Sequence, residues 1–212
     1  MSLHALPLPD AELALDPDWM PRAEADALLA TLLSGVAWEV HRIRLFGRLV
    51  DSPRLSCWIG DPGVTYAYSG TRFAPHPWPP ALGAIRARIE AACGTPFNSV
   101  LANLYRDGRD AMGWHRDDER ELGGEPVIAS LSLGATRRFL LKRAPVHGAT
   151  VPAKTRAADL PPARPLALQL GHGSLLRMAG DTQRHYRHAL PRTAREVGPR
   201  VNLTFRQVAA AR

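Results

Sequence analysis

The chain has 212 residues, enough for one domain with a substantial core, and with 45% hydrophobic and 22% charged residues its composition is ordinary for a globular protein. It has no apolar run near the roughly 18 residues that cross a bilayer, no basic-then-apolar secretory N-terminus, and too few cysteines, two, for a disulfide scaffold. We therefore expect a cytoplasmic monomer without membrane contact. The net charge of +7 favours phosphate-bearing partners, although many basic proteins bind no nucleic acid.

The first half of the chain predicts two helices and a few short strands. Residues 1–20 contain three prolines and are expected to be irregular or extended. A helical pattern covers residues 21–33, with Pro21 suited to the first turn and Gly35 to the end. Strands are expected at 40–48, with a turn at 45–47, and at 65–68. A second helix is expected at 81–92, ended by Gly94. Both helices are expected to cover a sheet.

From residue 99 onward the chain predicts short strands separated by turns. The expected strands are 99–106, 127–133, 137–142, 166–170, 174–178, 184–189 and 200–207. Such spacing favours a sandwich or jelly roll over alternating strands and helices. Residues 144–165 are rich in proline and lack a period, so we expect a long loop. The predicted fold class is mainly β with flanking helices (α+β), in a single domain covering residues 1–212.

The last predicted strand alternates strictly between apolar and polar residues. Its apolar face consists of Val201, Leu203 and Phe205, and its polar face of Arg200, Asn202, Thr204 and Arg206. The polar face is either a solvated edge or part of a barrel interior. In the second case two fixed guanidinium groups require a doubly anionic ligand, and a dicarboxylate fits that description.

One histidine and one aspartate are spaced for metal binding. In extended backbone His115 and Asp117 point to the same side, about 6–7 Å apart along the chain. A second histidine from a distant strand would complete a two-histidine, one-carboxylate set typical of non-haem iron(II) oxygenases. Both His185 and His188 are candidates, and one extended strand cannot aim both inward. A surface or capping histidine is the common alternative.

Six segments together resemble the AlkB family of iron(II)- and 2-oxoglutarate-dependent dioxygenases, which repair alkylated nucleic acid bases. They are residues 103–108, 115–121, 132–134, 172–176, 188–191 and 199–206. The similarity spans about residues 40–207 and is closest to the DNA-repair branch that includes the second human homologue. It implies a double-stranded β-helix (jelly-roll) core at 99–207. Residues 1–98 would be an N-terminal extension that carries the helices, packed outside the core, and the nucleotide-recognition elements.

The resemblance also implies roles for individual residues. His115, Asp117 and His188 match the catalytic metal ligands, which favours His188 over His185. Arg200, supported by Tyr105, would bind the far carboxylate of 2-oxoglutarate. Arg206 would bind the carboxylate beside the metal, with Asn103 and Asn202 nearby. The resemblance leaves open which arginine takes which end. Dioxygen would be the second co-substrate.

The same comparison implies how an alkylated base would be held. Tyr66, Tyr68 and Ser69 match a segment that stacks on the base opposite His115, and Glu119 would lie near the exocyclic amino group. Phe46 resembles a finger that fills the gap left by a flipped base. Ordinary strand or turn packing is the alternative for these aromatics. Further candidate phosphate contacts, which could equally be solvated surface, are Arg48, Arg54, Lys142, Arg143, Lys154 and Arg156.

The function expected from the resemblance is oxidative demethylation of bases such as 1-methyladenine and 3-methylcytosine, with release of formaldehyde, succinate and CO2. The expected partner is alkylated DNA, preferably duplex, with single-stranded DNA or RNA as alternatives. Two further readings compete with it: an oxygenase that acts on protein, and a basic jelly-roll domain that binds damaged DNA without turnover. The sequence does not rank methyl against etheno lesions.

Overall fold

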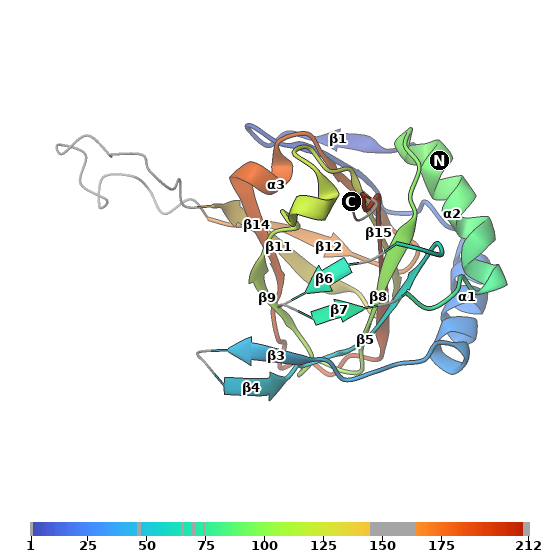
Figure 1. Cartoon of the computed structure of the whole chain (residues 1–212). Helices are drawn as coiled ribbons and strands as arrows, with labels where there is room; N and C mark the ends of the chain where they lie inside the picture. Colours follow the sequence, from blue (N-terminus) through green and yellow to red (C-terminus); the bar gives the residue numbers. More distant parts are fainter. Residues whose placement is uncertain are drawn as a thin grey trace.

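The last strand, β15 (Arg200–Arg206), lies in the middle of the larger of two antiparallel sheets (Figure 1). The structure is a computed structural model, and it describes residues 2–45, 48–64, 66–68, 71–73, 75–144 and 164–209. The larger sheet has the order β1-β2-β13-β10-β15-β8-β5. Besides β15 it contains β1 (His4–Leu6), β2 (Glu12–Asp16), β5 (Leu55–Gly60), β8 (Ser99–Tyr105), β10 (Ile128–Gly134) and β13 (Leu175–Ala179).

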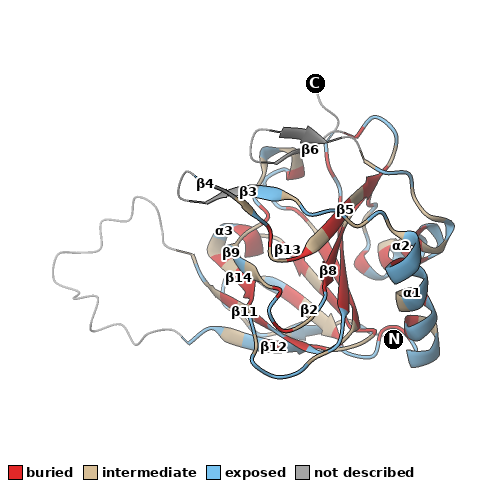
Figure 2. Ribbon diagram, turned by 90° about the horizontal axis from the view of Figure 1, so that it is seen from below, coloured by how far each residue is buried: buried red, intermediate tan, exposed pale blue. Residues whose placement is uncertain are grey.

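The smaller sheet has the order β12-β11-β14-β9. Its strands are β9 (Met112–His115), β11 (Arg137–Arg143), β12 (Leu166–Leu170) and β14 (Tyr186–Leu190). Two separate hairpins pair β3 (Arg42–Leu45) with β4 (Arg48–Asp51) and β6 (Tyr66–Tyr68) with β7 (Thr71–Phe73). In both views the β3–β4 hairpin lies on the side of the molecule away from the helices α1 and α2 (Figures 1 and 2).

The helices lie outside the sheets, as the sequence predicts. The long ones are α1 (Arg22–Gly35) and α2 (Pro80–Cys93), and Gly94 ends α2 in the left-handed conformation at φ 69°. Two short helical turns are α3 (Thr182–His185) and the 3-10 turn at Arg120–Leu122. Within the described residues, none of the helices combines the length and the apolar character that a membrane span needs.

Apolar residues form two main cores. One lies between the larger sheet and the helices, where Leu203 and Phe205 of β15 pack with Leu32 of α1 and Ile89 of α2. The other joins the two sheets and includes residues of β10, β11, β12, β13 and β14. Every residue of β15 is buried, so its polar face cannot be a solvated edge. Of the two interpretations of this strand, the barrel interior is correct.

The seven strands predicted after residue 99 are all present, each within about two residues of its expected bounds. Several described strands were not predicted, namely β1, β2, β5, β7 and β9, and neither were the two short helical turns. Strands β1 and β2 form from the proline-containing lead-in, where β2 pairs with β13. Strand β5 has buried residues on both faces and therefore lacks a clear alternation. The turn α3 includes residues 184 and 185, which the sequence assigned to the start of a strand.

The apolar face of β15 should dominate the stability of the domain. Phe205 has no exposed surface, and its ring lies 6.2 Å from that of Trp78 and 6.1 Å from that of Phe97. We expect Phe205→Ala to lower the free energy of unfolding by about 3–5 kcal/mol, because it leaves a cavity. Urea denaturation measures this loss. The matched control is Leu33→Ala on α1, where the leucine is 36% exposed; equal losses in both variants would contradict this view of the core.

Candidate metal centre and its pocket

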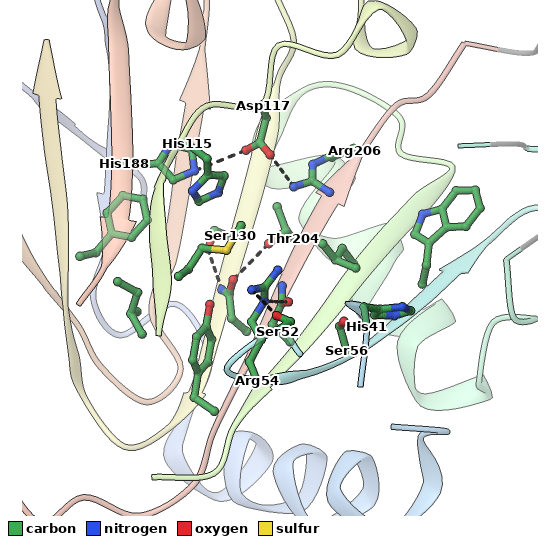
Figure 3. Close-up of a pocket in the computed structure, with 18 of the residues that line it drawn as sticks. His41, Ser52, Arg54, Ser56, His115, Asp117, Ser130, His188, Thr204 and Arg206 are labelled. Carbon is green, nitrogen blue, oxygen red and sulfur yellow. Dashed lines mark hydrogen bonds and ion pairs between the residues drawn. The ribbon is translucent and has the colours of Figure 1, made fainter. Parts of the chain in front are cut away.

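The polar face of β15 lines a pocket between the two sheets (Figure 3). The cavity has a volume of about 190 Å³. All four polar residues of the strand reach it, together with residues of β5, β8, β10, β11 and β14. Its lining also includes His41 and Ser52, which flank the β3–β4 hairpin, and His76, which follows β7. Residues next to both hairpins therefore contribute to the pocket.

Three side chains with metal-binding atoms converge in this pocket. His115, Asp117 and His188 each offer one ligand atom, and these atoms all lie within 4.8 Å of one another. His115 ends β9 and is paired across the sheet with His188 in β14, so their rings lie 4.2 Å apart. Asp117 follows β9 by two residues, and its Oδ2 is 3.6 Å from His188 Nε2. No other such cluster occurs in the part of the chain that the structure describes.

Both imidazoles are set up to act as neutral ligands. His115 Nδ1 lies 2.8 Å from the Gly113 carbonyl oxygen and must donate to it, which leaves the Nε2 lone pair for a metal. Burial lowers the pKa of His115, although the Asp117 charge opposes this. Burial, reinforced by His115, lowers the pKa of His188 to about 3. At neutral pH no proton has to leave either ring before a metal binds.

Asp117 is buried and ionised. Burial by itself raises the pKa of its carboxyl group, but the Arg206 charge, together with the two neighbouring imidazoles, outweighs burial and lowers it. Arg206 Nη2 donates to Asp117 Oδ1 at 2.6 Å (Figure 3). Two imidazoles and one carboxylate, with open positions between them, are the donor set that suits non-haem iron(II). The three side chains therefore fit that metal.

Of the two candidate second histidines, the structure places His188 in the pocket and His185 outside it. His185 ends the helical turn α3 and is half-buried. It does not line the pocket, as far as the described residues go. The sequence argument that His185 and His188 cannot both point inward assumed one extended strand through both residues. In the structure β14 begins only at Tyr186, after His185.

A second buried guanidinium lies at the other end of the polar face. Arg200 is 2% exposed, its Nη2 donates to Ser132 Oγ at 2.9 Å, and its guanidinium carbon is 5.3 Å from the centre of the Tyr105 ring. Burial lowers its pKa to about 10. Its Nε and Nη1 have no hydrogen-bond partner among the described residues. A buried cation with two orphaned donors is costly, and it fits an anionic ligand group such as a carboxylate.

The two asparagines lie between the arginines. Asn202 pairs across the strands with Asn103, two positions from Arg200 and four from Arg206. The register therefore does not favour the expected association of both with Arg206 alone. Asn202 Nδ2 donates to Ser130 Oγ at 2.8 Å.

Arg54 was expected as a candidate phosphate contact on the surface, and the structure contradicts this. It is 7% exposed and lines the pocket. Its Nε donates to Asn103 Oδ1 at 2.7 Å and its Nη1 to Ser52 Oγ at 2.8 Å. Because β5 was not predicted, the sequence offered no signal that Arg54, just before it, faces inward.

The residues expected to contact the base are only partly described. Glu119 lines the pocket, as expected for a group that contacts the substrate. The backbones of Tyr66 and Tyr68 form β6, and nothing is described of their side chains. Phe46 and Ser69 lie outside the described residues, as do Lys154 and Arg156.

The remaining candidate phosphate contacts lie at strand ends. Arg48 is exposed at the start of β4. At the end of β11, the Lys142 ammonium group lies 4.1 Å from the centre of the Trp114 ring, and Arg143 forms an ion pair with Asp10.

Residues 12–206 match the 2OG-Fe(II) oxygenase superfamily. The chain is 41% identical over 190 residues to the DNA oxidative demethylase ALKBH2 of Bos taurus, covering 88% of this chain and 66% of that protein. For the Homo sapiens ALKBH2 the identity is 40%, over 88% of this chain and 70% of that protein. The Alpha-ketoglutarate-dependent dioxygenase alkB homolog 3 of Homo sapiens is 38% identical to this chain, over 93% of this chain and 66% of that protein. The chain thus spans about two thirds of these relatives' length.

The fold likewise resembles that of a solved structure. OsALKBH1 superposes with a TM-score of 0.61, covering 97% of this chain and 99% of that chain, at 17% sequence identity. At this identity the likeness concerns the fold alone. Together with the superfamily match it confirms the expected jelly-roll core.

The geometry of the metal centre predicts that the two candidate histidines differ in their effect on metal affinity. We expect wild-type protein to bind Mn(II), as a stable substitute for iron(II), and His188→Ala to lose at least about tenfold in affinity, because one of three ligands is gone. Isothermal titration calorimetry measures the dissociation constant. His185→Ala, three residues away and outside the pocket, is the control and should bind as the wild type does. Weakened binding in His185→Ala alone would contradict the assignment.

Proposed function

Because the chain belongs to the AlkB family within the 2OG-Fe(II) oxygenase superfamily, we propose that it is an iron(II)- and 2-oxoglutarate-dependent dioxygenase that repairs alkylated DNA. The observation that carries the proposal is one pocket that holds both a two-histidine, one-carboxylate cluster and a buried arginine with orphaned donors. The first fits the metal and the second fits an anionic co-substrate. A domain that only binds damaged DNA would require neither the metal-binding cluster nor the buried arginine.

Different residues of the pocket would have different roles in the reaction. His115, Asp117 and His188 would hold the metal. When bound, iron(II) would supply the oxidative chemistry of the overall reaction, in which 2-oxoglutarate and dioxygen give succinate and CO2 and one oxygen atom is added to the N-methyl group of the base. The resulting hydroxymethyl group leaves the nitrogen as formaldehyde, which restores the base. The protein's share is to bind, to orient and to keep both imidazoles unprotonated.

The two arginines suggest the orientation of 2-oxoglutarate. Arg206 contacts Asp117, so it lies at the metal end of the pocket. Arg200 lies six residues away on the same face of β15 and contacts no carboxylate among the described residues. We assign the carboxylate beside the metal to Arg206 and the far carboxylate to Arg200. Tyr105 and Ser132, which contact Arg200, would fix that end.

The target base would enter from the side of the hairpins. Glu119 lines the pocket two residues after Asp117, where its carboxylate can accept a hydrogen bond from an exocyclic amino group. Tyr66 and Tyr68 of β6, with Ser69 next in the sequence, would hold the base against His115. Phe46, which comes between β3 and β4 in the sequence, would fill the gap left in a duplex.

The bases proposed as substrates are 1-methyladenine and 3-methylcytosine in duplex DNA. Support for DNA comes from the relatives named as DNA oxidative demethylases and from the net charge of +7. We also propose that residues 1–212 act as one domain, as a monomer in the cytoplasm.

The orphaned donors of Arg200 predict the effect of a substitution that preserves charge. Arg200→Lys removes the planar fork, so 2-oxoglutarate should bind about 10–100-fold more weakly, which corresponds to about 1.5–3 kcal/mol for charge-assisted hydrogen bonds. Calorimetric titration of Mn(II)-loaded protein without dioxygen measures this directly. Arg138→Lys, an exposed arginine of β11, is the control. Unchanged binding in Arg200→Lys would refute the assignment of the far carboxylate.

The proposed substrate is tested by formaldehyde release from oligonucleotides that carry 1-methyladenine, with iron(II), ascorbate and 2-oxoglutarate. We expect release from duplex DNA to exceed release from single strands, and Phe46→Ala to remove that preference because the wedge is lost. Asp117→Ala is the blank.

Other outcomes of this assay separate the alternatives. Higher activity on single-stranded DNA or RNA would keep the dioxygenase and refute the finger. No release, despite binding of Mn(II) and 2-oxoglutarate, would mean that the substrate is of another class.

A further inference from the structure

A buried glutamine behind the pocket contacts the backbone of Asp117. Gln183 is the second residue of the turn α3 and is 2% exposed. Its Oε1 accepts a hydrogen bond from the backbone N–H of Asp117 at 3.0 Å, across 66 residues of sequence. Its Nε2 lies 3.6 Å from Met178 Sδ. The side chain thus links the turn before β14 to the segment after β9.

The orientation of the Gln183 amide is fixed by these neighbours. An N–H can only donate, so the end of the amide that faces Asp117 must be the carbonyl oxygen. The amide nitrogen then faces a thioether, which is a weak acceptor. Burying an amide is costly unless its hydrogen bonds are strong, and one of these two is weak. The strong one is the bond to Asp117.

Asp117 needs support because no strand holds its backbone. Strand β9 ends at His115, and residues 116–119 are irregular. Its carboxylate must nevertheless lie between Arg206 and His188, with one oxygen close to each. A free N–H buried at this point would cost about 1–3 kcal/mol and would let the segment shift. The Gln183 bond removes that cost in the one conformation that places the carboxylate in the cluster.

The position of Gln183 also joins two ligand-bearing segments. The turn α3 leads directly into β14, which carries His188 five residues after Gln183 (Figure 1). The bond to Asp117 therefore ties the segment with the carboxylate to the segment with the second histidine. Outer contacts of this kind, which orient the ligands of a metal, typically change metal affinity by 10–100-fold when they are removed.

We propose that Gln183 is a positioning residue that holds the backbone of Asp117 in its metal-binding conformation. This inference rests on the proposed metal centre and adds a residue to it that contacts neither metal nor substrate. Its signature is a change of metal affinity in protein that remains folded. A glutamine that only stabilised the turn α3 would change the unfolding transition and leave metal affinity unchanged.

The test is the dissociation constant for Mn(II), measured by electron paramagnetic resonance of the free ion at a temperature where all variants are folded. Gln183→Met keeps the length of the side chain and removes the acceptor, so the dissociation constant should rise about 10–100-fold. The control is Thr182→Val in the same turn. Thr182 is 1% exposed and its hydroxyl donates to the Ala179 carbonyl and accepts from Glu12 N–H, so this variant disturbs the turn without touching Asp117.

Each outcome decides the proposal. A rise in Gln183→Met with wild-type affinity in Thr182→Val supports it. Wild-type affinity in Gln183→Met, or an equal rise in both variants, overturns it. Should Gln183→Met fail to fold, Gln183→Asn, which withdraws the carbonyl by one methylene, is judged by the same criteria. Absence of Mn(II) binding in the wild type would instead refute the metal centre itself, so the two failures are distinguishable.

Discussion

The buried ion pair between Arg206 and Asp117 is the contact on which the pocket depends. Each charge alone would be costly between the sheets, because removing an ion from water costs several kcal/mol. Paired at 2.6 Å the two charges compensate each other, and the other carboxylate oxygen lies 3.6 Å from His188 Nε2. The pair also joins the larger sheet, through β15, to the segment that follows β9 of the smaller one. The same contact therefore helps to close the barrel and orients a candidate metal ligand.

Strand β15 serves two purposes because its side chains alternate. One face supplies Val201, Leu203 and Phe205 to the core beneath the helices, and the other supplies the arginines to the pocket. A shift of register by one residue would exchange the two faces and destroy both. The helices α1 and α2 cover the apolar face of the larger sheet, including that of β15, so that the polar face of β15 points into the pocket.

Much of this was predictable from the sequence, and the failures have physical causes. The alternation of β15 predicted its two faces, but only the burial of the strand distinguished the interior from an edge. His115 and Asp117 were recognisable from their spacing. Spacing alone left His185 and His188 open, because the helical turn before β14 was not predicted, and only the family resemblance favoured His188. Arg54 and Gln183 carried no signal, because their partners, Asn103 and Asp117, lie 49 and 66 residues away.

The central claim is that the metal and the dicarboxylate share one pocket in a fixed orientation. Crystals grown without dioxygen, with iron(II), 2-oxoglutarate and the protein, test it most directly through anomalous scattering at the iron edge. The account predicts one iron peak bound by His115, Asp117 and His188, with the far carboxylate of 2-oxoglutarate on Arg200. An iron peak elsewhere, or a far carboxylate bound by Arg206, would contradict it.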